Sequence, residues 1–586
     1  MKLARCLGYA LFASATLLLA AGPAGLAADT PKAKLEAKQE LRKKLQAAKK
    51  AEELKKETEA KKAAESAKPV PVAPVVPAEK PQAAKAVSPA AKDPALMAKM
   101  IDAGINAKIT EAKSVSSPIC SDAEFLRRAY LDIVGVIPSG DKAKEFIDST
   151  DPAKRSKLID ELLANPLYGR HQSDLWIPKL YPKDSANRFI TKEPLAKWFE
   201  EQFNANTPWN QFVTNLVTAT GSIDKNPEVM YFLANRSVDK LTDTVTQHFL
   251  GIQLQCAQCH NHPFTGWKQT EYWGMATFFS KVMAQAPRNA NKGGDNTQLG
   301  VREGPTATKA KDFFPESAKT VPAKFLGAEA PKLNSSEPYR PALAAWMTSA
   351  ENPYFAKAMV NRTWHQFFGS GFVNPIDDMH DENPASHPEL LADLSHAFAS
   401  GGFDVKNLIR GICLSQTYQR SSKPTAGNER AEDLFVKMTV KVMIPEQLYD
   451  SIKLASGPTP AEMNKDKRAA AGAKGGPVTD RDRFVQFFLA GADEASTTDY
   501  EAGIPQALKL MNSKMSAPAS LKTMAKSGTK TSDMLDTMFL ATLSRRPSAN
   551  EVKQLTEYVS KSSTPTEAYS DVFWALLNSS EFTMVR

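Results

Sequence analysis

The chain has 586 residues, of which 42% are hydrophobic and 24% are charged, the composition of an ordinary globular protein. Most of the formal net charge of +9 lies near the N-terminus, where residues 31–68 hold thirteen Lys and Arg against seven Glu. The part of the chain after residue 93 therefore lacks the basic excess that is typical of nucleic-acid-binding proteins, and we expect no nucleic-acid partner.

The N-terminus has the features of an export signal. Lys2 and Arg5 precede an apolar run over residues 7–21, and small residues at positions 25–27 suit a signal peptidase. The run of about 15 residues is shorter than the roughly 20 that a membrane-spanning helix needs. We expect residues 1–28 to be a signal peptide that directs the protein to the periplasm or cell envelope, with no transmembrane span after cleavage. An uncleaved anchor is the alternative.

Residues 29–95 are predicted to form a low-complexity tether. Residues 32–68 consist mostly of Ala, Lys, Glu, Leu and Gln, strong helix formers without an apolar stripe, and predict a solvated helix. Residues 69–92 contain six prolines and favour an extended linker. The lysines of the helical part would allow this tail to touch an anionic surface.

After the tether the sequence predicts a mainly α-helical fold with two domains. Ser121, Ser386 and Ser548 are each followed by Glu three residues later, the pattern of a capping box at the start of a helix. Strand-like alternation is scarce outside residues 299–327, where Gly, Pro and Thr are frequent. The expected organisation is a first domain over 96–295, a linker or small insertion over 296–335, and a second domain over 336–586.

Residues Cys256 to His260 form the sequence Cys-Ala-Gln-Cys-His, the attachment signature of c-type haem. In that chemistry two thiols bond to the porphyrin and the imidazole binds the iron. Phe249, Ile252 and Cys256 fall on one face at helical spacing, so the motif is predicted at the end of a helix with its two thiols and imidazole on one side. The sequence therefore predicts a haem c site in which Cys256 and Cys259 are attached covalently and His260 is the proximal ligand.

Other interpretations of this motif remain open. His262 extends it to C-x-x-C-H-x-H, which also suits zinc or iron held by thiols, one imidazole and an outside ligand. Without a cofactor, Cys256 and Cys259 would form a local disulfide or remain structural thiols. In an oxidising compartment Cys120 and Cys413 would pair with each other. A bound haem would need a second axial ligand, for which the candidates are Met275, Met283, His365 and His380.

A second candidate centre lies in the predicted C-terminal domain. Asp377, Asp378 and His380 fall within the run Asp-Asp-Met-His-Asp-Glu, a set of groups that can bind a divalent cation or act as acid and base on a carbohydrate. The simpler interpretation is a solvated acidic loop before the next helix. The motifs of serine hydrolases, phosphate-binding loops and zinc proteases are absent from the sequence, so no enzyme class is assigned.

Several blocks of the sequence resemble a known pair of families. The blocks RRAYLDIVG at 127–135, NPLYG at 165–169 and FLGIQLQCAQCHNHPF at 249–264 resemble the planctomycete cytochrome-associated family called domain of unknown function 1549. The blocks NRTWHQFFG at 361–369, SHPELL at 386–391 and SQTY at 415–418 resemble its usual partner, domain of unknown function 1553. The resemblance covers most of residues 96–586 and implies export, two domains and a cytochrome-like motif. Many relatives carry a separate cytochrome c domain where this chain has its tether.

These observations predict an exported protein that transfers electrons through a haem at Cys256, Cys259 and His260, with a redox protein as partner. The alternative is a non-redox envelope protein that binds a polysaccharide or another protein. In that alternative the thiols are structural or hold zinc or iron.

Overall fold

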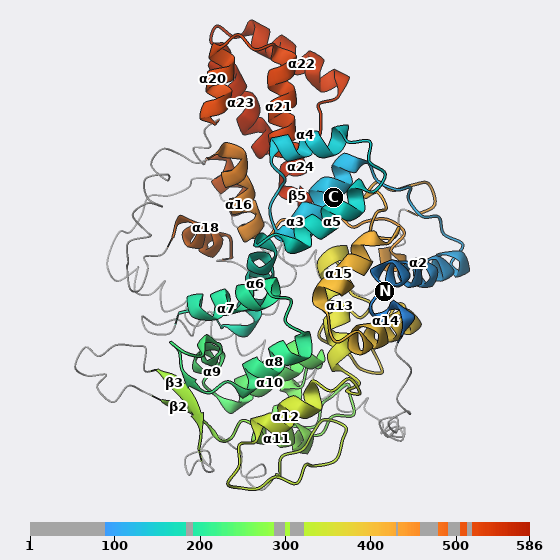
Figure 1. Ribbon diagram of the computed structural model, residues 1–586, viewed down its shortest axis with the longest axis vertical. Helices are drawn as coiled ribbons and strands as arrows, with labels where there is room; N and C mark the ends of the chain where they lie inside the picture. The colour runs from blue at the N-terminus through green and yellow to red at the C-terminus, as the bar shows by residue number, and fades with distance from the viewer. Residues whose placement is uncertain are drawn as a thin grey trace, which may run out of the picture. The chain divides into compact units, whose positions relative to one another are not determined.

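The computed structural model describes the body of the protein from residue 88 onward (Figure 1). The predicted signal peptide and nearly all of the predicted tether lie outside the described residues. The described ranges are 88–182, 191–285, 299–304, 321–428, 432–457, 479–489, 504–512 and 518–586.

Helices dominate the described residues, as predicted. In the first half they are α2 (Pro94–Glu111), α3 (Asp122–Val134), α4 (Gly140–Asp148), α5 (Lys154–Ala164), α6 (Leu167–Leu180), α7 (Glu193–Asn204), α8 (Trp209–Thr218), α9 (Met230–Ala234), α10 (Val238–Leu250) and α11 (Gln269–Thr277), with the 3₁₀ helices η2 (Pro89–Ala91), η4 (Pro227–Val229) and η5 (Gln255–Gln258). In the second half they are α12 (Arg340–Met347), α13 (Phe355–Phe368), α14 (Pro388–Ser400), α15 (Val405–Leu414), η10 (Glu432–Leu434), α16 (Pro445–Ser456), α18 (Asp480–Leu489), α19 (Ile504–Met511), α20 (Ala519–Lys526), α21 (Thr531–Leu543), α22 (Ala549–Lys561), α23 (Pro565–Leu577) and α24 (Ser580–Thr583).

The last residues of the predicted tether belong to the folded body. Ala90 and Ala91 lie in η2 and are buried, and the Asn407 side chain donates a hydrogen bond to the Ala91 carbonyl (3.1 Å). Helix α2 then begins at Pro94 and is capped by Asp93, whose carboxylate accepts the backbone N–H of Ala95 (2.9 Å). The extended linker predicted through residue 92 is therefore wrong at its end, because small alanines pack against a core as readily as they occur in a linker.

Two of the predicted capping boxes begin helices in the structure. Ser548 and Glu551 form the complete box: the serine Oγ accepts the Glu551 N–H (3.3 Å) and the glutamate accepts the Ser548 N–H (2.7 Å). At Ser121 only the serine half forms, with the Glu124 N–H as donor (3.3 Å). The Glu124 carboxylate instead pairs with Arg128 at 2.6 Å.

The described strands are short and form two small sheets. Strand β3 (Gly300–Glu303) is the centre of a three-stranded antiparallel sheet, between β1 (Gly221–Ser222) and β2 (Val282–Gln285). Glycine is needed at position 300, because a Cβ there would collide with the Gly221 carbonyl oxygen. Part of the predicted linker or insertion over 296–335 is thus an integral strand. A two-stranded ribbon pairs β4 (Lys441–Val442) with β5 (Met584–Val585).

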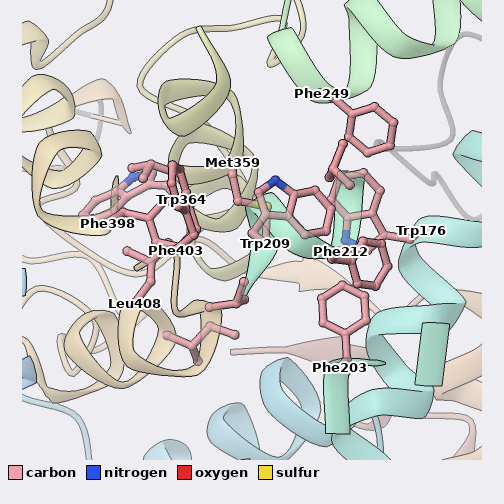
Figure 2. Packing of buried hydrophobic residues seen from close by; sticks show 14 of the residues in the cluster. Trp176, Phe203, Trp209, Phe212, Phe249, Met359, Trp364, Phe398, Phe403 and Leu408 are labelled. Carbon is pink, nitrogen blue, oxygen red and sulfur yellow. The ribbon is translucent and has the colours of Figure 1, made fainter. Parts of the chain in front are cut away.

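The main hydrophobic core runs through both predicted domains (Figure 2). The Trp209 ring from α8 lies 5.9 Å from Phe249 of α10 and 6.5 Å from Phe355 of α13, measured between centroids. Phe355 in turn lies 5.5 Å from Phe403, which precedes α15. These rings pack continuously, and the described residues fall in one compact unit.

A second, smaller core lies among the C-terminal helices, drawn in red in Figure 1. It includes Met538 of α21 and Phe573 of α23, together with Leu131 of α3. Arg127 of α3 fastens this region by donating to the carbonyl oxygens of Thr542 (2.8 Å) and Phe582 (2.7 Å). Among the described residues, no helix has the length and apolar character required to span a membrane.

Candidate functional site

The Cys-Ala-Gln-Cys-His motif does not continue helix α10. The helix ends at Gly251, whose φ of 69° places it in the left-handed region that favours glycine. The Ile252 N–H then bonds to the Thr246 carbonyl (3.0 Å), and the motif lies on the separate helix η5 and the turn that follows it. The predicted helical face from Phe249 to Cys256 is wrong, because the chain changes direction at Gly251.

The motif has a buried side and an exposed side. Leu254 and Ala257 are almost fully buried, whereas Cys256, Cys259 and His260 are exposed. Residues three apart in a 3₁₀ helix lie above one another, so the two apolar side chains anchor η5 in the core. Both thiols are free, and they and the imidazole are open to solvent.

Helix α11 holds the backbone of this turn in place. The Gln269 side chain donates to the carbonyl oxygens of Gln258 (3.1 Å) and Cys259 (3.0 Å), and the Trp273 indole N–H also donates to Gln258 (3.1 Å). The Asn261 side-chain oxygen accepts the Gln269 backbone N–H (3.1 Å). These bonds fix the turn through its main chain and leave the cysteine side chains available for chemistry.

The imidazole of His260 is oriented as a metal ligand would be. Its Nδ1 lies 2.7 Å from the backbone carbonyl oxygen of Asn261. A carbonyl oxygen can only accept, so Nδ1 carries the hydrogen and the lone pair of the neutral ring is on Nε2. Histidines that bind metals usually donate their other ring N–H in this way, which fixes the tautomer.

His262 has the opposite arrangement. The Phe264 backbone N–H donates to its Nδ1 (3.3 Å), so the hydrogen of the neutral ring is on Nε2. Its own backbone N–H donates to the Trp267 carbonyl (2.8 Å). Partial burial lowers its pKa. In this tautomer His262 supports the turn, and the nitrogen that points away from the backbone has no lone pair for a metal ion.

The acidic loop of the second candidate centre lies against the motif. The Met379 N–H donates to the Gly251 carbonyl (2.9 Å), directly ahead of η5. The charges of Asp378 and His380 act on the pKa of His262, the carboxylate raising it and the second imidazole lowering it. The structure therefore brings together two candidate centres that are more than 100 residues apart in sequence.

Within this loop Asp377 is occupied by protein partners. Its buried carboxylate forms an ion pair with Arg362 of α13, lies 3.6 Å from His248 Nδ1 and accepts the Gln247 side-chain amide (3.5 Å). Burial acts against the charge, but the Arg362 guanidinium outweighs it and the pKa of Asp377 is lowered. Asp377 thus anchors the loop to α10 and α13, and these protein partners occupy its carboxylate.

Asp378 and His380 remain partly accessible. His380 Nε2 lies 3.5 Å from Asp378 Oδ2, and the side chains are 16% and 30% exposed respectively. The His380 Nδ1 is buried without a hydrogen-bond partner. Across the ranges that the structure describes, no group of three or more His, Cys, Asp or Glu side chains is arranged to hold a metal ion.

His387, which flanks this loop, is structural. It is the N-cap residue of α14 and lies 5.8 Å from Phe372 and 5.5 Å from Phe435, between ring centroids. Burial lowers its pKa to about 4. The capping box predicted at Ser386 is wrong, because the serine Oγ lies 3.0 Å from the His387 ring nitrogen and caps no backbone N–H.

The predicted bridge between Cys120 and Cys413 does not form. Both cysteines are free and buried, and burial raises the pKa of each thiol. The Cys120 sulfur lies 3.8 Å from the Arg128 guanidinium. Each thiol packs as a small apolar group with its own neighbours, a role that cysteine often has in a core.

Comparison with family models gives two matches that divide the chain between them. Residues 100–284 match PSCyt2, a protein of unknown function (DUF1549), and residues 339–559 match PSD1, a protein of unknown function (DUF1553). The chain belongs to the paired DUF1549–DUF1553 family. No curated protein and no solved structure matches it. The cysteine motif lies in the DUF1549 region and the loop with His380 lies in the DUF1553 region, so the site contains residues of both.

The DUF1553 region contributes two positioning residues that sequence reasoning missed. Asn361 of α13 donates to the carbonyl oxygens of Val373 (3.0 Å) and Ile376 (3.2 Å) and accepts the Val373 N–H (3.0 Å). Its neighbour Arg362 holds Asp377. Both lie in the block NRTWHQFFG, which gave the family resemblance but no indication that it supports a loop.

The residues at the turn fit a c-type haem. Cys256 and Cys259 are free, exposed thiols on one short turn, and His260 has a ring nitrogen available for iron. His262 does not share this arrangement. A haem held by these three residues would supply one-electron chemistry, and the protein would supply the fixed turn that orients the ligands.

Proposed function

We propose that this DUF1549–DUF1553 protein is an exported electron-transfer protein that carries haem c on Cys256 and Cys259, with His260 as the proximal ligand. The hydrogen bond from His260 Nδ1 to the Asn261 carbonyl carries this proposal, because it leaves the lone pair of the neutral ring on Nε2, in a turn that also holds two free thiols. Export to the periplasm or cell envelope belongs to the proposal, since c-type haem and the N-terminal signal point to the same compartment.

The exposure of the motif supports a role in exchange of electrons with a redox protein. Electron transfer requires close approach of two cofactors, and the thiols and His260 lie at the surface. Phe264 is 68% exposed and follows the motif, which offers an apolar contact beside it. Apolar and aromatic side chains of this kind are enriched at protein contacts.

The alternative proposal is a non-redox envelope protein that binds a polysaccharide or a protein through another surface. The thiols would then stay free or hold zinc or iron. Both cysteines are free in the structure, which is compatible with that role as well. The two proposals differ in one observable, the covalent attachment of haem.

The deciding experiment is expression of the full chain together with a cytochrome c maturation system. After denaturation and removal of free haem, we expect the mass of one haem and a c-type absorption spectrum to stay with the polypeptide. Cys256→Ala combined with Cys259→Ala should abolish this attachment, whereas the matched pair Cys120→Ala and Cys413→Ala should retain it. Wild-type protein without covalent haem would overturn the electron-transfer proposal, and metal analysis of that sample would test zinc and iron.

A second comparison tests the assignment of the proximal ligand. His260→Ala should change the absorption spectrum of the bound haem, because it removes the nitrogen that is prepared for iron. His262→Ala serves as the control, since its Nδ1 is engaged by the Phe264 N–H. Equal spectral changes in both variants would contradict the assignment.

A further inference from the structure

The geometry points to His380, from the DUF1553 region, as the second axial ligand of the haem held by the DUF1549 motif. This inference rests on the proposed function. It selects one of the four candidates that the sequence left open.

Residues of α13 hold the loop that carries His380 in place. Asn361 makes three hydrogen bonds to the backbone of residues 373 and 376, and the next residue, Arg362, forms an ion pair with Asp377. Asp377 also contacts α10 through His248 at 3.6 Å. A ligand that binds with little reorganisation needs support of this kind, because ordering a loop on binding costs free energy.

The loop also contacts the segment that leads into the motif. The Met379 N–H bonds to the Gly251 carbonyl (2.9 Å), and a Cβ at Gly251 would lie 3.1 Å from the Met379 sulfur. The Met379 thioether is therefore packed against the end of α10. His380, one residue further, follows directly on this contact with the segment that leads into the motif.

The state of the His380 ring suits a ligand. Nε2 faces the Asp378 carboxylate at 3.5 Å, while Nδ1 is buried without a hydrogen-bond partner. A buried polar atom without a partner is costly, so such atoms often mark a place where a ligand binds. An imidazole with one nitrogen at a carboxylate and the other unpaired is also the usual arrangement for binding a metal ion.

The other candidates are less well placed. Met275 is fully buried in α11 as part of the main core. Met283 lies in β2, where its sulfur would be 2.7 Å from a Cβ at Gly304, the residue after the neighbouring strand β3. His365 lies in α13 and not on the loop that bonds to Gly251.

The test is the spin state of the haem in matured full-length protein. With two axial nitrogen ligands, we expect the ferric wild type to be low-spin and the ferrous form to resist carbon monoxide. His380→Ala should become high-spin and bind carbon monoxide, with covalent haem content unchanged, and added imidazole should restore the low-spin spectrum. Glu382→Gln, an exposed change on the same loop, is the matched control and should behave as the wild type.

The outcomes separate this inference from the function on which it rests. Covalent haem that is low-spin in both the wild type and His380→Ala, or high-spin in the wild type, would overturn the role of His380 and leave the proposed function standing. Wild-type protein without covalent haem would overturn both. Should His380→Ala fail to fold, His380→Met provides the second variant: it should keep a low-spin haem with a changed absorption spectrum, and an unchanged spectrum would contradict the assignment.

Discussion

Two regions of the molecule use their polar side chains in opposite ways. The motif turn, residues 254–264, presents free thiols and imidazoles at the surface. In the second region Arg128 donates to the carbonyl oxygens of Tyr418 (2.7 Å) and Arg420 (3.0 Å), and the Lys441 ammonium lies 2.6 Å from Asp132. We name this second region the Arg128 cluster, consisting of Arg128, Asp132, Cys413, Tyr418 and Lys441.

The difference lies in whether the polar groups already have protein partners. In the Arg128 cluster the Asp132 carboxylate accepts from both Lys441 and the Tyr418 hydroxyl (2.9 Å), and Cys413 is buried beside them. On the motif turn the bonds to α11 use backbone carbonyls and the Asn261 side chain, and the cysteine side chains stay available. Buried polar groups whose hydrogen bonds are all made within the protein stabilise the fold. Polar side chains without protein partners, on a turn that is held in place, can bind a ligand.

The largest expected contrast is in thiol reactivity. In protein without haem, Cys256 and Cys259 should alkylate at the rate of exposed thiols, whereas Cys120 and Cys413 should react only after local opening. An opening free energy on the order of 4 kcal/mol corresponds to a rate about 10³-fold lower. Timed alkylation followed by peptide mass spectrometry measures all four sites at once, and similar rates would remove the distinction between the two regions.

Breaking the ion pair between Lys441 and Asp132 in the Arg128 cluster should lower the stability of the protein. Lys441→Met leaves the Asp132 carboxylate buried and without its ammonium partner, so we expect the free energy of unfolding to fall by about 3–5 kcal/mol. Lys144→Met is the matched control, because Lys144 pairs with Asp148 at the surface and such pairs contribute about 0–1 kcal/mol. Urea unfolding of both variants measures the difference, and equal losses would contradict the assignment of a buried pair.

A histidine next to the Arg128 cluster should make stability depend on pH. His171 is buried, and burial lowers its pKa to about 3 from an ordinary value of 6.5. Between these values the unfolded chain binds a proton that the folded chain does not, so the free energy of unfolding falls as the pH falls below 6.5.

By pH 4.5 this loss should reach about 2–3 kcal/mol, taking 1.36 kcal/mol for each unit below the unfolded pKa. Unfolding in urea at pH 7.5 and 4.5 tests it: His171→Gln should show a smaller loss between the two pH values than the wild type. His260→Gln, on the exposed motif turn, should retain the wild-type loss.

The smallest expected effect concerns the turn at the end of α10. Gly251→Ala places a side chain at a φ of 69° and 3.1 Å from the Met379 sulfur, and it should lower the free energy of unfolding by about 1–2 kcal/mol. Gly402→Ala is the control, because φ there is 84° but nothing lies within 4 Å of the added Cβ. The difference between the losses of unfolding free energy in Gly251→Ala and Gly402→Ala measures the contact between Gly251 and the loop that carries Met379. Equal losses would show that this contact contributes little to stability.

The sequence predicted more of the fold class than of the site. Helical spacing, the cap at Ser548 and the scarcity of strand-like alternation correctly indicated a mainly α-helical body. The capping box at Ser386 and the helix continuing to Cys256 were wrong, since a contact of Ser386 with the neighbouring His387 ring and a left-handed glycine decide those two places. Export, haem and partners stay predictions.

The sequence by itself determined the local chemistry: two thiols and an imidazole within five residues, and a carboxylate-rich loop with His380 farther along the chain. Only the tertiary structure decided that these two segments meet, that Asp377 is used by Arg362, and that His260 rather than His262 has an available Nε2. The reason is physical. Residue types and short spacings are properties of neighbours in the chain, whereas burial, tautomer and pairing depend on atoms that only the packed fold brings together.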